Sequence, residues 1–191
     1  AMLLWAAWSW FGVAPPDSAN AISIAFGLGQ FAIVAWAAVA LRHRNTTRVS
    51  NTVALIAVLV ICTNRTFLQW MTSGLETSAF NFGLLGWVLW SFRRDCKRTT
   101  WLVVWSMLAM FTALTRPDGL LLVAATLAVA TIQFCSKTRS VGASMLGLLP
   151  MLPVAAHVLW RRWFYGEWLP NTYYAKVLEA WPEAGVRYLT C

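Results

Sequence analysis

Long apolar runs separated by short polar stretches make up most of the chain. A helix needs about 20 residues to cross a bilayer core of about 30 Å, and several of the runs are that long. The pattern predicts an all-α protein, a polytopic transmembrane helical bundle of about six spans preceded by a partial N-terminal segment. The apolar runs are 1–13, 19–41, 51–63, 78–92, 99–115, 119–135 and 141–160.

The composition agrees with a membrane protein. Hydrophobic residues make up 59% of the 191 residues and charged residues only 12%, whereas soluble domains are closer to half apolar and a quarter charged. The first residues, "AMLLW", lack the charged start of a signal peptide, and the last, "VRYLTC", begin a new apolar run. We therefore expect residues 1–191 to be a single incomplete transmembrane domain of a longer protein.

Two kinds of polar loop alternate along the chain. Basic loops carry "RHRNTTR" (42–48), "RRDCKR" (93–98) and "SKTR" (136–139). Positive charge collects in cytoplasmic loops of membrane proteins, so these loops are predicted to be cytoplasmic. The intervening motifs, at 72–77, 116–119 and 163–176, then share the extracytoplasmic face of a multi-pass protein of the cell membrane.

The net charge of +8 is explained by these loops. No basic face carries interleaved stacking aromatics, so no nucleic-acid partner is expected. The four cysteines lack metal-type spacing. We expect no cofactor, although the sequence leaves the need for a divalent metal open. The 13 tryptophans mostly fit the aromatic belts at the membrane interfaces.

The motif "RPDG" (116–119) joins two apolar runs. Pro117 at a helix start, Asp118 in the first turn and Gly119 at a crowded position describe a helix–turn–helix corner. A corner of this kind does not need an arginine, so it leaves the presence of Arg116 on a predicted extracytoplasmic loop unexplained. Ionisable groups at membrane depth usually face a cavity or a partner, so Arg116 is a candidate anion contact.

The motif "TSGLET" (72–77) precedes another apolar run. Thr72 or Ser73 is expected to cap that helix, with Glu76 completing a capping box. Alternatively, a carboxylate at this helix start binds a sugar hydroxyl or a cation.

Polar and aromatic residues are concentrated in "WFYGEWLPNTYYAK" (163–176). Gly166 and Pro170 break the helix, and Asn171 or Thr172 can cap a new one. We predict an extracytoplasmic loop and amphipathic helix over 163–180, either facing lipid or binding an anion such as a lipid phosphate. Arg161 and Arg162 end the preceding run on the face where positive charge is disfavoured, and a bound anion would explain them.

Together, "TSGLET", "TRPDG" and the stretch from Arg162 to Lys176 resemble motifs of the GT-C superfamily of membrane glycosyltransferases. The nearest group is the actinobacterial terminal arabinofuranosyltransferases and their bacterial relatives. The resemblance implies an inverting enzyme that transfers a sugar from a polyprenyl phosphate to a glycan or lipid-linked acceptor outside the cytoplasm. It also implies a general base in a loop before residue 1, so we expect this chain to be inactive alone.

The resemblance assigns substrate-binding roles to Glu76, Arg116, Asp118, Arg162, Asn171, Tyr173, Tyr174 and Lys176. The cations would stabilise charge that develops on the departing lipid phosphate. The Asn and Tyr side chains would bind phosphate oxygens or stack on the sugar, and the two acids would orient the cations or bind sugar hydroxyls.

Other functions fit parts of the pattern. A related GT-C mannosyltransferase would share the mechanism and differ in the sugar it transfers to protein or lipid. A transporter or flippase would use the same cations for a translocating anionic lipid-linked substrate, but the inverted repeats typical of transporters are not visible. A membrane subunit with a purely structural role would not explain the positively charged residues clustered on the predicted extracytoplasmic face.

Overall fold

Every element described by the computed structural model is helical, which confirms the all-α class. The structure describes residues 12, 15–44, 52, 56, 59–60, 63–72, 76–93, 98–136 and 140–168, and these contain no strand. The chain divides into two compact units, Ala1–Leu152 and Pro153–Cys191. The elements are α2 (Pro15–Arg44), α4 (Arg65–Thr72), α5 (Thr77–Ser91), α6 (Thr99–Thr115), η1 (Pro117–Gly119), α7 (Leu120–Cys135), α8 (Val141–Leu148), η2 (Leu149–Met151) and α9 (Leu152–Tyr165).

Three helical stretches of the described residues are long and apolar enough to cross a membrane: Ala19–Ala37, Pro117–Cys135 and Val141–Tyr165. Helix α6 is apolar and somewhat shorter. These helices have the length and composition of an integral membrane protein. The predicted count of about six spans stays a prediction, because the run at 1–13 and most of the run at 51–63 lie outside the described residues.

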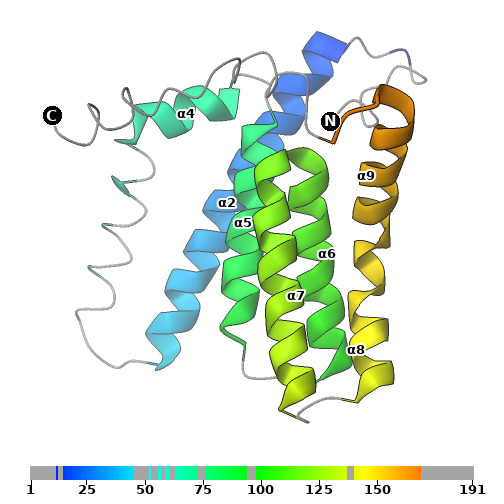
Figure 1. Ribbon diagram of the computed structural model, residues 1–191. Coiled ribbons are helices and arrows are strands. Elements are labelled where there is room, and N and C mark those ends of the chain that lie inside the picture. Colours follow the sequence, from blue (N-terminus) through cyan, green and yellow to red (C-terminus); the bar gives the residue numbers. More distant parts are fainter. Residues whose placement is uncertain are drawn as a thin grey trace, which may run out of the picture. The chain divides into compact units, whose positions relative to one another are not determined.

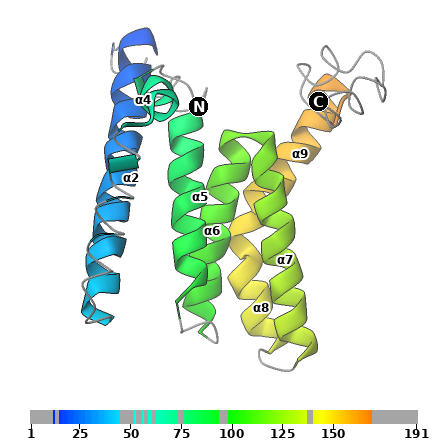
Figure 2. The same ribbon diagram turned by 90° about the vertical axis from the view of Figure 1, so that its left-hand side faces the viewer.

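In the first unit, α5, α6 and α7 run in alternating directions (Figure 1). Helix α2 packs on α5 on the side away from α7 (Figure 2), and α8 packs on α6. The start of α5 and the α6–α7 turn therefore lie at one end of this unit. Arg93, Arg98 and Ser136 lie at the other end, as the alternation of loops predicts. Which end faces the cytoplasm stays a prediction.

Glycines on α5 and α8 allow these helices to approach α6 closely. A Cβ atom added at Gly83 would lie 2.7 Å from side-chain atoms of Phe111 and Thr112 on α6. A Cβ atom at Gly147 on α8 would lie 2.5 Å from the side chain of Leu102. Small residues are typical of helix interfaces in membranes, where van der Waals packing and interhelical hydrogen bonds drive helix association.

Four tryptophans pack between helices of the first unit rather than facing only the membrane interface. The indoles of Trp87 and Trp105 stack with ring centroids 4.7 Å apart, and Trp105 is buried at 3% exposure. Trp90 and Trp101 each donate the indole N–H to the other's backbone carbonyl, at 3.0 and 3.1 Å. The N–H groups of these four indoles find their partners inside the helix bundle.

Helix α9 ends at Tyr165, and Gly166 adopts a positive φ of 72°. This conformation favours glycine, so the predicted helix break at Gly166 is confirmed. The predicted loop from residue 163 begins three residues later, because residues 163–165 complete the last turn of α9. The remainder of the predicted stretch beyond Trp168 lies outside the described residues.

Candidate functional site

The α6–α7 corner is built as its sequence predicts. Arg116 leaves the helix with an extended backbone (φ −145°, ψ 145°), and Pro117 opens the short helix η1. A proline disfavours the helical conformation of the residue before it. Pro117 therefore accounts for the end of α6 at Thr115. Gly119 lies so close to the backbone of Thr112 and Ala113 that it has no room for a Cβ atom.

Arg116 forms an ion pair with Asp118 across this corner. The Nη2–Oδ2 distance is 2.8 Å, and the two side chains are 35% and 59% exposed. Exposed ion pairs contribute little to stability, so the pair mainly orients the guanidinium. A guanidinium carries five N–H donors, and the bond to Asp118 leaves several of them for a ligand.

The same guanidinium lies over the ring of Phe80 on α5, with 5.4 Å between Cζ and the ring centroid. Phe80 is one helical turn beyond Glu76, since its backbone N–H donates to the Glu76 carbonyl at 2.9 Å. The structure therefore places Glu76, Arg116 and Asp118 at one end of the first unit. Among the described residues, Arg116 pairs with Asp118 and not with Glu76.

The predicted capping box at Glu76 is wrong. Helix α5 begins at Thr77, so that Glu76 itself is the N-cap residue, and it makes no side-chain capping bond. Thr72 is the last residue of α4 and lies too early in the chain to cap α5. The Glu76 carboxylate is thus not engaged in capping at this end of the unit.

Arg162 belongs to the second unit. It lies in the last turn of α9, and its guanidinium stacks over the Trp168 ring at 5.4 Å from the centroid. Its convergence with Arg116 on one substrate stays a prediction. The other predicted site residues, Asn171, Tyr173, Tyr174 and Lys176, lie outside the described residues.

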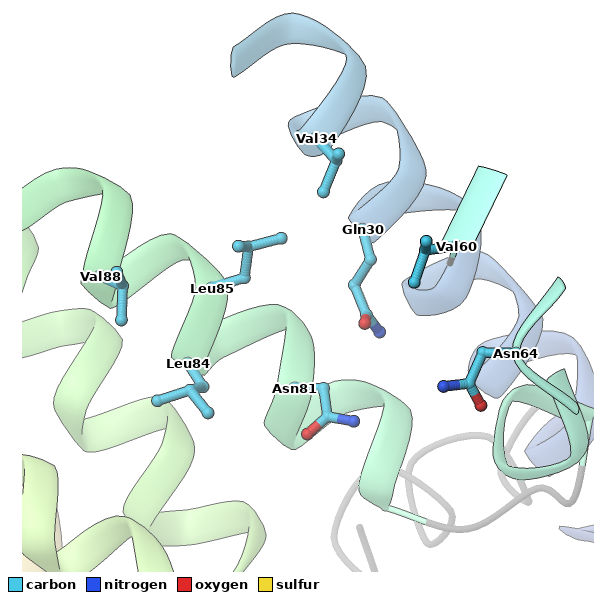
Figure 3. A pocket seen from close by; sticks show the side chains of 8 residues that line it. All are labelled: Gln30, Val34, Val60, Asn64, Asn81, Leu84, Leu85 and Val88. Atoms are coloured by element: carbon cyan, nitrogen blue, oxygen red, sulfur yellow. The ribbon is translucent and has the colours of Figure 1, made fainter. Parts of the chain in front are cut away.

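Sequence reasoning missed a pocket between α2 and α5 that Val60 and Asn64 also line. The pocket has a volume of about 430 Å³, and three carboxamide side chains point into it (Figure 3). The available signal was a Gln or Asn inside an otherwise apolar run, at positions 30 and 81. The lining residues are Gln30, Val34, Val60, Asn64, Asn81, Leu84, Leu85 and Val88.

Within the described ranges, no cluster of three His, Cys, Asp or Glu side chains is placed to hold a metal ion. The α6–α7 corner offers a cation fixed by a neighbouring acid. Comparisons of the chain with models of protein families, with curated proteins and with solved structures gave no match.

Proposed function

We propose that this chain is part of an integral membrane glycosyltransferase of the GT-C type. It transfers a sugar from a polyprenyl phosphate to a glycan or lipid-linked acceptor, with inversion, on the extracytoplasmic face of the cell membrane. The proposal includes about six spans, with the turns at 72–77, 116–119 and 163–176 on that face. Support comes from the three motifs of the sequence and from the membrane-type helices that carry two of them.

The single observation that carries the proposal is the Arg116 guanidinium at the end of an apolar helix pair. Asp118 and the Phe80 ring hold it from two sides, while about a third of the side chain remains accessible. An oriented guanidinium suits a phosphate, which it can bind through two parallel hydrogen bonds. A cation fixed in advance also stabilises the negative charge that develops as the sugar–phosphate bond breaks.

The remaining roles follow from this assignment. Arg162 and Lys176 are proposed as further cations for the lipid phosphate, and Asn171, Tyr173 and Tyr174 as contacts to its oxygens or to the sugar. Glu76 and Asp118 bind sugar hydroxyls or orient the cations. None of these residues is proposed as the general base, which the resemblance assigns to an N-terminal loop.

Binding of a short-chain polyprenyl phosphate to the chain in lipid nanodiscs tests the proposal. Hydrogen bonds to charged groups contribute about 1.5–3 kcal/mol, so Arg116→Ala is expected to weaken binding about ten- to a hundredfold. The matched control is Arg98→Ala, which removes a cation from the opposite end of the unit and should leave binding unchanged. The corresponding polyprenol, which lacks the phosphate, should bind both variants equally.

Wild-type affinity in Arg116→Ala would contradict the assignment of this corner to lipid phosphate. Enzyme and transporter are distinguished by a transfer assay in a protein that carries this chain together with a catalytic base. There, loss of one preorganised charge-stabilising group should lower the rate about 10²–10³-fold. Phosphate binding that depends on Arg116, without any sugar transfer, would favour the transporter.

A further inference from the structure

The pocket between α2 and α5 is polar at one end and apolar along its walls. Gln30 on α2, Asn81 on α5 and Asn64, which precedes α4, direct their amide groups toward the same space (Figure 3). The walls are formed by the aliphatic side chains Val34, Val60, Leu84, Leu85 and Val88. Its volume of about 430 Å³ lies within the range of about 300–1,000 Å³ for small-molecule sites.

Gln30 is the most informative of the three amides. It is only 6% exposed and lies within the apolar stretch Ala19–Ala37. Its Nε2 donates to the backbone carbonyl of Ser78 at 2.9 Å, but its carboxamide oxygen has no partner among the described residues. A donor group of a ligand in the pocket can hydrogen-bond to this oxygen.

Asn81 adds a second amide without a partner in the described part of the chain. It lies one turn beyond Thr77, where α5 begins, and faces the pocket from the opposite helix. A carboxamide offers both an acceptor oxygen and two N–H donors. Hydroxyl groups also donate and accept, so they complement such amides better than a group that only accepts.

None of the described residues that line the pocket carries a charge. A phosphate or carboxylate placed here would be desolvated without a compensating cation, which is strongly unfavourable. A purely hydrocarbon ligand would offer no hydrogen bond to the Gln30 carboxamide oxygen or to the Asn81 amide. The chemistry of the lining therefore selects an uncharged polar group attached to an apolar chain.

We propose that this pocket binds a neutral amphiphile, with the hydroxyl groups of its head on Gln30 and Asn81 and its hydrocarbon chain along Val34, Leu85 and Val88. This site shares no residue with the α6–α7 corner, and the inference does not rest on the proposed glycosyltransferase activity. An alkyl glycoside or a glycolipid has the required chemistry.

Photolabelling of the chain in phosphatidylcholine nanodiscs tests the site, with a dodecyl glucoside that carries a diazirine in its alkyl chain as the probe. We expect label on peptides from α2 and α5 that line the pocket. Unlabelled dodecyl glucoside should suppress this label. Dodecyl phosphate and dodecane at the same concentration should not, because one is charged and the other has no hydroxyl group.

Asn81→Leu tests the role of the amide and breaks no hydrogen bond among the described residues. Loss of one neutral hydrogen bond should reduce the apparent affinity of the glucoside about fivefold. Asn20→Leu is the matched control, since it makes the same change at an exposed position of α2 and should leave the affinity unchanged.

Several results would overturn the proposal. Equal competition by dodecane would show a site for hydrocarbon alone, and equal competition by dodecyl phosphate would show that charge is not excluded. Label outside α2 and α5, or cross-links from the pocket to a second copy, would assign another occupant. The competition series uses the unmodified protein, so it decides the question even where Asn81→Leu does not fold.

Discussion

Thr126 on α7 joins two helices through one hydroxyl group. Its Oγ1 accepts the indole N–H of Trp87 at 3.0 Å and donates to the Leu122 carbonyl at 2.8 Å. Thr126 is fully buried, so water cannot replace it as the partner of the indole. At the scale of single residues, the packing of this unit thus depends on polar side chains that pair inside an apolar bundle.

Thr126→Val should lower the free energy of unfolding by about 1 kcal/mol, because it keeps the shape of the side chain and leaves the Trp87 indole unpaired. Denaturation by SDS in mixed micelles, followed by far-ultraviolet circular dichroism, measures the change. Thr131→Val is the control on the same helix. Its hydroxyl donates only to the Leu127 carbonyl and is exposed, so an equal loss in both variants would contradict a special role for Thr126.

At the scale of helices, α5 packs against α6 through a face of small residues. Gly83 meets Phe111 and Thr112, and one turn further a Cβ atom at Gly86 would lie 3.3 Å from Leu108. Lipid tails are as apolar as leucine, so apolar side chains gain little by turning toward a neighbouring helix. Close approach of the two backbones provides the contact instead.

Gly83→Leu should lower the free energy of unfolding by about 3 kcal/mol, the upper end of the usual cost of overpacking a core. The same denaturation assay measures it. Gly142→Leu provides the matched control, because a Cβ atom at Gly142 meets nothing within 4 Å. It should change stability by less than about 0.5 kcal/mol. Comparable destabilisation by both variants would mean that leucine itself, rather than the α5–α6 contact, is responsible.

At the scale of the molecule, the alternating direction of α5, α6 and α7 separates two sets of polar residues. The corner that contains Arg116 and Asp118 lies at one end of the first unit, and Ser136 lies at the other (Figure 1). Positive residues are enriched on the cytoplasmic side, so the end with Arg93 and Arg98 is predicted to be cytoplasmic.

Cysteine labelling of intact cells with a membrane-impermeant maleimide tests this orientation. In a background where Cys62, Cys96, Cys135 and Cys191 are replaced, Asp118→Cys should be labelled from outside. Ser136→Cys should be labelled only after the membrane is permeabilised. The reverse pattern would place the Arg116 corner in the cytoplasm and would contradict the proposed extracytoplasmic donor site.

The sequence by itself determined the helical class and several of the helix ends. Backbone groups in lipid must be satisfied within the segment, so an apolar run such as 99–115 can be read as a helix, and α6 has those bounds. Pro117 and Gly166 act through their own backbone conformations, and both mark helix ends as predicted. The proximity of Arg116 and Asp118 also follows from their separation by two residues in a turn.

Only the tertiary structure decided which faces of the helices meet. The runs are apolar around most of their circumference, so their patterns do not distinguish a lipid-facing side from a packed side. The contact of Arg116 with Phe80, the pairing of Trp87 with Thr126 and the pocket at Gln30 each join residues more than thirty positions apart. Such contacts depend on how separate helices pack, and no local propensity encodes that arrangement.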